Sequence, residues 1–284
     1  METYDLKSWD EFDPLILDIR QRHGASTFIL PDGSRKENQL LFRGEAEADS
    51  GTALKTTLER TSAKPFDLLQ YMVAAYSCLN ELESFTGRQW DTKPFPQLEE
   101  EIKRVQDSMR LPIPDAIYPY LVYLRHHGFP SPLLDWTASP YIAVYFAFSN
   151  QVKADRAAIY VYIEKAREPE RVPGFTRVPG SMISVLGPKV TTHPRHFAQQ
   201  AWYTVAGEWS HEPQAWSFCP HLDVFRGKDG DREVLIRITI PRAQRSRILQ
   251  DLNDYNINHF TLYQSEESLV KALGMKCFDM NATA

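Results

Sequence analysis

Cysteine is scarce in this 284-residue chain, and several common active-site motifs are missing. The three cysteines, Cys78, Cys219 and Cys277, lie far apart, so their spacing excludes a zinc site and a disulfide framework and is typical of a reducing compartment. There is no Gly-rich phosphate loop, no His-Glu-x-x-His, no Gly-x-Ser-x-Gly and no dinucleotide fingerprint. The N-terminus does not resemble a signal peptide, and no run approaches the roughly 18 apolar residues of a membrane span. We therefore expect a cytoplasmic protein that binds neither a membrane nor a metal.

Charge of one sign is not in large excess. The net charge is −5 at pH 7, and 43% of the residues are hydrophobic, which is an ordinary globular composition. This charge excludes a protein that binds nucleic acid over its whole surface. Three arginines, Arg242, Arg245 and Arg247, share one predicted helix, where they could follow a phosphate backbone or form a solvated face.

Helical periodicity dominates the first half of the chain and strand patterns dominate the second. Helices are predicted over Trp9–Arg20, Pro65–Leu82, Gln97–Met109, Ala116–His126, 140–148, Arg242–Leu252 and Ser265–Leu273. Strands are predicted over Thr27–Leu30, Leu40–Gly44, Ala157–Glu164, Ile183–Leu186, Glu233–Ile240 and His259–Tyr263, with a loop over Phe129–Thr137. Without a linker, this order predicts a single α+β domain whose helical N-terminal half packs on a mostly antiparallel sheet.

Arg43 and Gly44 stand where a short apolar strand ends. An arginine there can point into a cleft, and a glycine lets another backbone or a ligand approach closely. The alternative is a structural arginine paired with a nearby glutamate.

Two further clusters mix polar and aromatic groups. In the proline-rich loop His126–Thr137, Asp135 and Trp136 are expected to brace the loop, whereas the roles of His127 and Thr137 stay open. The segment His193–Tyr203 combines an arginine, two glutamines and aromatics, a mixture that suits an anionic ligand with a ring. It could equally be a solvated loop.

Glu266 and Glu267 begin the last predicted helix. Carboxylates are favoured in a first helical turn by the helix dipole. One of them could instead stabilise a developing positive charge, but adjacent side chains point in different directions, so only one could serve.

Taken together, these segments resemble the FRG domain family, which is named for its Phe-Arg-Gly motif. The matching residues are Phe42-Arg43-Gly44, His127 to Pro140 with the string Leu-Leu-Asp-Trp-Thr, Ala143, Phe146-Ala147, Arg195 with Gln199-Gln200, and Tyr263–Leu273. Ser131-Pro132 replaces the Thr-Arg that is usual in this family. The resemblance implies an FRG domain over residues 40–284, preceded by an N-terminal extension over residues 1–39.

The order of the motifs also resembles that of ADP-ribosyltransferases of the Arg–Ser–Glu type. This second resemblance implies an ADP-ribosyltransferase-like sheet, NAD as substrate and no metal. It implies catalytic roles for Arg43, Thr137, Glu267 and Glu266. It implies NAD-binding roles for Arg43, Gly44, His127, Trp136, Ser139, Tyr145, Arg195 and Gln199.

The function that these resemblances imply is NAD-dependent mono-ADP-ribosylation of a protein or RNA, by an intracellular toxin or phage-defence effector. Such an enzyme would need an antitoxin or inhibitory protein partner. Two alternatives remain: a non-catalytic module that binds a nucleotide or RNA, and an NAD glycohydrolase that transfers ADP-ribose to water.

Overall fold

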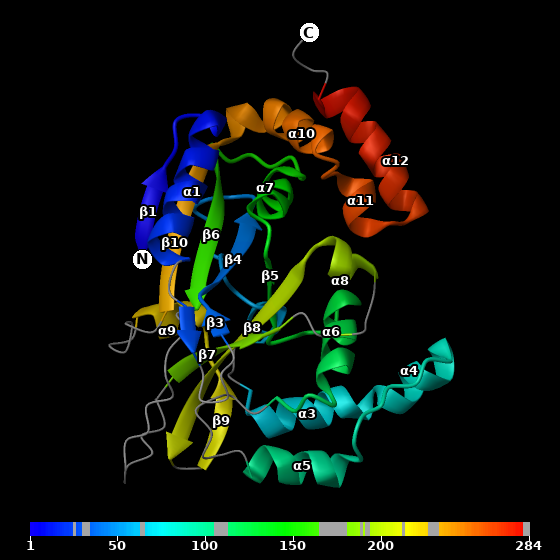
Figure 1. Cartoon of the computed structure of the whole chain (residues 1–284). Coiled ribbons are helices and arrows are strands. Elements are labelled where there is room, and N and C mark those ends of the chain that lie inside the picture. Colours follow the sequence, from blue (N-terminus) through cyan, green and yellow to red (C-terminus); the bar gives the residue numbers. More distant parts are fainter. Residues whose placement is uncertain are drawn as a thin grey trace.

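Eight strands form one mixed sheet in the computed structural model of the chain (Figure 1). The described residues are 1–24, 27–29, 35–62, 66–104, 113–164, 181–187, 190, 194–211, 214–226 and 233–280. The strand order is β1-β10-β6-β4-β5-β8-β7, with β9 paired to β8, and every pair is antiparallel except β1 with β10. The prediction of one α+β domain with a mostly antiparallel sheet is therefore confirmed.

The strands come from both halves of the chain. Their bounds are β1 Glu2–Asp5, β4 Gln39–Glu45, β5 Leu134–Thr137, β6 Arg156–Glu164, β7 Ser181–Leu186, β8 Ala201–His211, β9 Gln214–Phe218 and β10 Glu233–Pro241, and a separate hairpin joins β2 Thr27–Ile29 to β3 Arg35–Glu37.

The helices gather at the two ends of the sheet, with α10, α11 and α12 at one end and α3, α4 and α5 at the other (Figure 1). Their bounds are α1 Phe12–His23, α2 Thr57–Thr61, α3 Leu68–Ser77, α4 Leu79–Thr86, α5 Phe95–Arg104, α6 Tyr118–His126, α7 Pro140–Phe148, α8 Pro194–Ala198, α9 His221–Arg226, α10 Arg245–Asp254, α11 His259–Tyr263 and α12 Glu266–Met275. Short 3-10 helices over Trp9–Glu11 and Arg242–Gln244 precede α1 and α10, and a π-helical turn over Lys276–Met280 follows α12.

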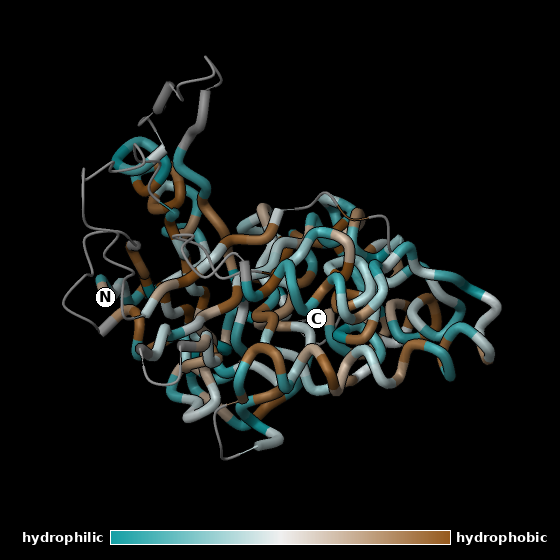
Figure 2. Tube along the Cα trace, turned by 90° about the horizontal axis from the view of Figure 1, so that it is seen from below, coloured by the Kyte–Doolittle hydropathy of each residue, from teal (hydrophilic) through white to brown (hydrophobic). Residues whose placement is uncertain are grey.

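The two faces of the central strands bury different side chains. Along β6, Ile159, Val161 and Ile163 enter an apolar cluster with α1, α7 and α10, whereas Ala158, Tyr160 and Tyr162 enter a second one beside α9. This alternation follows from the two-residue period of a strand that is covered on both faces. A third cluster packs α3, α5 and α6 against β8 and β9. Hydrophobic segments accordingly recur along the strands and helices in Figure 2, with hydrophilic ones between them.

The sheet is weakly joined between β4 and β5. β4 pairs with β6 over its whole length, Gln39–Glu45, but it pairs with β5 only at Phe42 and Thr137. β5 pairs on its other side with β8, from Leu134 to Thr137. The two parts of the sheet therefore diverge on either side of a single residue pair.

The segment that precedes residue 40 completes this sheet. β1 is an edge strand parallel to β10, and Leu6, Trp9, Phe12 and Ile16 are buried in the first apolar cluster. Trp9 Nε1 donates a hydrogen bond to Asp251 Oδ2 of α10 (2.9 Å). The extension expected over residues 1–39 thus shares its core with the later strands and helices. Residues 30–34, within that range, lie outside the described residues.

Three predicted elements differ from those in the structure. The helix predicted over Pro65–Leu82 is two helices, α3 and α4, which meet at Cys78. The predicted loop Phe129–Thr137 contains strand β5, because Leu134–Thr137 finds partners on both sides. The predicted strand His259–Tyr263 is helix α11, whose first turn is closed by a capping box between Asn258 and Thr261.

Other predicted elements have bounds close to the observed ones. α7 begins after Ser139, whose Oγ accepts a hydrogen bond from the Ile142 N–H (3.4 Å). The predicted helix Gln97–Met109 corresponds to α5, and its last five residues, 105–109, lie outside the described part of the chain. None of the helices over the described residues has the length and apolar character needed to cross a bilayer.

Candidate functional site

A pocket of about 340 Å³ lies where β4 and β5 diverge. Its volume is within the range of small-molecule sites. It is lined by Phe42, Arg43, Gly44, Arg125, His126, Asp135, Trp136, Thr137, Phe146, Arg195, Gln199, Ala201, Tyr203 and Tyr263. These residues come from β4, α6, β5, α7, α8, β8 and α11, so most of the chain's length contributes to one cavity.

Arg43 lies on β4 and bridges the gap to β5. Its Nε donates to Glu45 Oε1 (2.8 Å), and its Nη1 donates to the carbonyl oxygen of Asp135 (2.9 Å). Its Nη2 makes no hydrogen bond to the described residues, which leaves donors available to a ligand. Both readings of this arginine therefore hold in part: it is paired with a nearby glutamate, and it lines the cavity.

Gly44 is required by close packing of α7 on β4. A Cβ atom at this position would lie 1.9 Å from the carbonyl oxygen of Ala143 and 2.8 Å from the backbone nitrogen of Ala147. Both are backbone atoms of α7 and cannot move aside as a flexible side chain would. The glycine thus brings α7, and with it Phe146, against the strand that carries Arg43.

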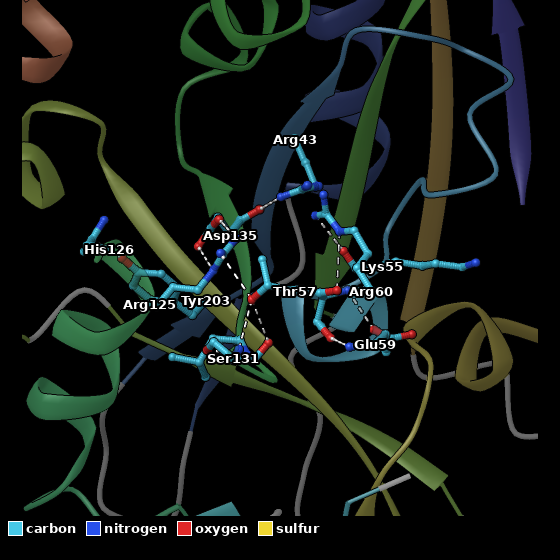
Figure 3. A network of polar contacts seen from close by, with 12 residues as sticks. Arg43, Lys55, Thr57, Glu59, Arg60, Arg125, His126, Ser131, Asp135 and Tyr203 are labelled. Atoms are coloured by element: carbon cyan, nitrogen blue, oxygen red, sulfur yellow. Dashed lines mark hydrogen bonds and ion pairs between the residues drawn. The ribbon is translucent and has the colours of Figure 1, made fainter. Parts of the chain in front are cut away.

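Asp135 connects three elements around the pocket (Figure 3). Its Oδ1 accepts a hydrogen bond from Arg125 Nε (3.2 Å), and its Oδ2 accepts a second from Arg125 Nη2. Arg125 Nη1 also lies 3.5 Å from Thr57 Oγ1, which in turn accepts a bond from the Ser131 N–H (2.9 Å). Asp135 therefore does brace the loop, as expected, but its side chain is 42% exposed and faces the cavity.

His126, Tyr203 and His196 form a chain of hydrogen bonds along one wall. The hydroxyl of Tyr203 lies 3.0 Å from His126 Nε2 and 3.4 Å from His196 Nδ1. Burial raises the pKa of the Tyr203 hydroxyl well above its ordinary value, so that the phenol stays protonated at neutral pH.

Thr137 and Trp136 are buried at the inner end of the pocket. Thr137 Oγ1 donates to the carbonyl oxygen of Gln199 (2.8 Å) and accepts from the Ser139 N–H (3.1 Å). Trp136 Nε1 donates to Thr204 Oγ1 (2.8 Å), which lies 2.9 Å from His221 Nε2. Burial, and then the charge of Arg43, lower the pKa of His221 to about 3. His221 is therefore neutral at physiological pH.

Arg195 and Gln199 join α8 to α11 over the pocket. Arg195 Nε donates to the carbonyl oxygen of Tyr263 (3.3 Å), and its guanidinium lies 5.3 Å from the centre of the Tyr263 ring. Gln199 Nε2 donates to the carbonyl oxygen of Leu262 (3.1 Å). His193, at the start of the predicted cluster, lies outside the described residues.

Several expected site residues do not line the pocket. His127 is exposed and packs on Tyr123, with ring centroids 4.2 Å apart, and Ser139 caps α7. Tyr145 is buried, with its hydroxyl 3.0 Å from His259 Nδ1.

Glu266 and Glu267 are exposed in the first turn of α12 and are also absent from the pocket lining. Backbone and Ser265 hydrogen bonds at the helix start lower the pKa of Glu267, with a smaller effect from the charge of Arg195. Its carboxylate is thus ionised at neutral pH, outside the pocket lining.

Arg125 is a lining residue that the sequence did not point to, and Tyr263 stood out only as the first residue of the segment Tyr263–Leu273 that resembles the family. Arg125 lies in the last turn of α6, where a basic residue is common for reasons of the helix dipole alone. Its pairing with Asp135, ten residues later, was not visible as a motif.

Each arginine of the α10 region has partners within the fold, two of them in partly or fully buried positions and Arg247 at the surface. Arg242 donates to the carbonyl oxygens of Ala46, Ala147 and Asn150 (2.8, 3.0 and 2.5 Å). Arg245 bonds the Phe148 carbonyl and Asp279, and Arg247 pairs with Asp10. Arg242 and Arg245 therefore do not belong to a solvated face, whereas Arg247 is exposed. The three do not form a free phosphate-binding row.

Metal ligation has no support from the described residues, which contain no group of three His, Cys, Asp or Glu side chains close enough to hold an ion. The pocket offers instead three arginines, a single carboxylate, several aromatic rings and an amide. Such a set suits a ligand with both an anionic group and a ring.

Comparison with protein families gives one match. Residues 38–156 match the FRG domain, a range that includes Arg43, Gly44, Arg125, Asp135 and Thr137. The resemblance inferred from the sequence is therefore confirmed over that range. No curated protein and no solved structure matches the chain.

Proposed function

Since the chain carries an FRG domain over residues 38–156, we propose that it uses this pocket to bind NAD and to transfer ADP-ribose from it to a macromolecule. The observation that carries the proposal is the convergence of Arg43, Thr137 and Arg195 on one cavity, although they are far apart along the chain. These residues belong to the motifs that resemble those of ADP-ribosyltransferases.

The charge of the pocket supports a diphosphate ligand. Three arginines line it against one carboxylate, in a chain whose net charge is −5. Arginine binds phosphate oxygens through two parallel N–H donors, which fixes the orientation as well as the position of the ligand. Arg43 and Arg195 would each hold one phosphate group, with Arg43 anchored to β5 through the Asp135 carbonyl.

The aromatic and amide groups support a ring with a carboxamide, as in nicotinamide. Phe146, Tyr203 and Tyr263 offer ring faces or edges, and Gln199 lines the same pocket. Offset stacking and edge contacts with such rings contribute about 0.5–1.5 kcal/mol each beyond buried area. Trp136 would contribute an edge at the inner end, since it is itself buried.

The reaction begins with cleavage of the bond between ribose C1′ and the nicotinamide nitrogen. The bonding electron pair leaves with nicotinamide, which departs neutral, and the positive charge passes to the ribose ring. An acceptor nucleophile then donates an electron pair to C1′ and loses its proton to solvent or a base. The site must supply a negative group near the ribose and exclude competing water.

A specific observation favours a second candidate, a nucleotide-binding module without catalysis. Neither Glu266 nor Glu267, the carboxylates expected to be catalytic, lines the pocket. A binding module would keep the arginines and need no carboxylate. An NAD glycohydrolase would share the pocket and transfer ADP-ribose to water.

Incubation with NAD labelled in its ADP-ribose part, together with a cell extract, separates these functions. A transferase gives label on protein or RNA, and the Arg43→Ala variant gives none. Free ADP-ribose alone identifies a glycohydrolase. Binding of NAD without any turnover identifies the binding module, and the proposal would then be wrong.

A role as a toxin or defence effector would follow from this chemistry, because NAD consumption and modified RNA or protein both harm the host cell. Expression of the wild type should then arrest growth, and expression of Arg43→Ala should not. An inhibitory partner would be identified as a gene product that restores growth when it is co-expressed with the wild-type protein.

A further inference from the structure

We propose that Asp135 supplies the carboxylate that faces the ribose cation during ADP-ribosyl transfer, in place of Glu266 or Glu267. This inference rests on the function proposed above. The observation behind it is that Asp135 is the one acidic residue among the described residues that line the pocket.

The other nearby carboxylates are less well situated. Glu45 is absent from the pocket lining, and its Oε1 accepts a bond from Arg43. Glu266 and Glu267 are exposed on the first turn of α12. By contrast, the Asp135 side chain is 42% exposed while its partner Arg125 is only 13% exposed, so the carboxylate is the more accessible member of a pair that lines the cavity.

The Asp135 carboxylate is held in a fixed orientation (Figure 3). Arg125 bonds both oxygens through Nε and Nη2, and each oxygen keeps a further lone pair for a ligand. The carbonyl of the same residue accepts the bond from Arg43 Nη1. Asp135 therefore carries the carboxylate and, through its carbonyl oxygen, also positions Arg43, the arginine proposed to bind the diphosphate. Such preorganisation is what makes electrostatic stabilisation effective when charge develops.

The negative charge of Asp135 acts on both walls of the pocket. After burial, which is the main cause, it contributes to the raised pKa of the Tyr203 hydroxyl on β8. It also contributes to the raised pKa of Tyr263 on α11, where burial is again the main cause and the charge of Arg195 opposes it. A cation formed between these walls would be attracted to the same carboxylate.

Asp135 forms no covalent bond in this step. The C1′–N bond breaks, its electron pair goes to nicotinamide, and the positive charge on ribose is stabilised by the ionised carboxylate until the acceptor's lone pair attacks C1′. The acceptor's proton leaves to solvent, so the carboxylate ends the cycle as it began.

The test compares Asp135→Asn with Glu267→Gln as a matched loss of one carboxylate charge. Nicotinamide release and NAD affinity are measured for both variants and for the wild type. We expect Asp135→Asn to lose at least about 100-fold in nicotinamide release, with NAD affinity within about threefold of wild type. Glu267→Gln should stay close to wild type in both.

Two results would overturn the assignment: near-normal release by Asp135→Asn, or a loss in release that only follows a loss in NAD affinity. A loss confined to Glu267→Gln would return the role to α12 and leave the proposed transferase function intact. If the wild type neither binds NAD nor releases nicotinamide, the proposed function fails and the assignment fails with it.

The double variant Asp135→Asn/Arg125→Gln, compared with Arg125→Gln alone, decides the matter if Asp135→Asn does not fold. The double variant removes both charges of the ion pair, so no guanidinium is left unpaired. We expect it to release nicotinamide at least about tenfold more slowly than Arg125→Gln at similar NAD affinity. Equal release by the two proteins would show that the Asp135 carboxylate is not needed, and the proposal would be wrong.

Discussion

At the scale of single residues, Gly44 is the position where the fold tolerates no side chain. Gly44→Ala would bring a Cβ atom to 1.9 Å from the Ala143 carbonyl oxygen, so α7 would have to move off β4. We expect the free energy of unfolding to fall by at least about 3 kcal/mol, the upper end of overpacking costs. Thermal or urea denaturation measures it.

Gly51→Ala is the matched control for this substitution, because a Cβ atom there meets nothing within 4 Å. It should leave stability nearly unchanged. Equal stability of the two alanine variants would show that α7 does not pack against β4 as closely as described.

His221 should make the fold sensitive to acid. Its folded-state pKa of about 3 is below the ordinary value of 6.5, so the unfolded chain takes up the proton first. Stability is therefore full above about pH 6.5 and falls as pH drops toward 3, by at most ~1.4 kcal/mol per pH unit for one group. Urea unfolding between about pH 7 and pH 5 should show a shallower decline for His221→Gln than for the wild type.

The opposite result, an unchanged slope in His221→Gln, would mean that His221 titrates normally in the folded protein. His259, whose pKa is lowered to about 4 mainly by burial, acts in the same direction and remains in both proteins. The difference between the two slopes therefore isolates His221.

Single-residue roles were predictable where they depended on a contiguous motif. Arg43, Gly44 and Thr137 belong to such motifs, and all three line the pocket. The exposure of Asp135 was not predictable, because it depends on how the ion pair with Arg125 is placed in the pocket wall. Glu266 and Glu267 looked equally suitable in the sequence, which cannot say how far α12 lies from β4.

At the scale of elements, Arg242 joins the turn before α10 to the chain around the ends of β4 and α7. In the sequence it could have contacted a phosphate backbone or belonged to a solvated face. Arg242 is buried and donates to three carbonyl oxygens. Arg242→Met keeps most of the apolar volume but leaves those acceptors unpaired. We expect a loss of about 3 kcal/mol in the free energy of unfolding, as for charged hydrogen bonds removed from a buried site.

Arg247→Met is the control for this element. Arg247 pairs with Asp10 at the surface, where solvent and salt screen the interaction, and its loss should change stability little. If Arg247→Met were the more damaging of the two in denaturation experiments, the described anchoring of α10 would be wrong.

Elements with a clear period and cap were predictable, and those defined by distant partners were not. α7 follows from the Ser139-Pro140 start and an apolar run. β5 has only four residues, and its partners lie 95 positions away in β4 and 64 to 70 positions away in β8, so the local sequence indicated a loop. For α11, the Asn258–Thr261 capping box was the available signal, and its short apolar segment suggested a strand instead.

At the scale of the whole molecule, the sheet depends on strands from beyond the range that matches the FRG domain. Residues 38–156 contain β4 and β5, but their partners β6 and β8 lie almost entirely outside this range. The fragment 38–156 would expose unpaired strand edges and would lack part of each apolar cluster, most of all the one around α1, α7 and α10. We expect it to show no cooperative unfolding transition by circular dichroism, whereas the full chain does.

Cooperative unfolding of that fragment would contradict this account of the sheet. The composition and element types predicted the α+β class, but not that β1 joins the opposite edge of the sheet from β7. Strand order is set by contacts between residues far apart in the chain, such as Glu2 with Ile236, for which the sequence offers no local signal.

The most direct test of the central claim is calorimetric titration of the full-length protein with NAD. We expect saturable binding by the wild type, its loss in Arg43→Ala, and unchanged binding in Arg247→Ala, whose side chain pairs at the surface with Asp10. Equal binding by all three proteins, or no binding by the wild type, would contradict the claim that the pocket between β4 and β5 is an NAD site.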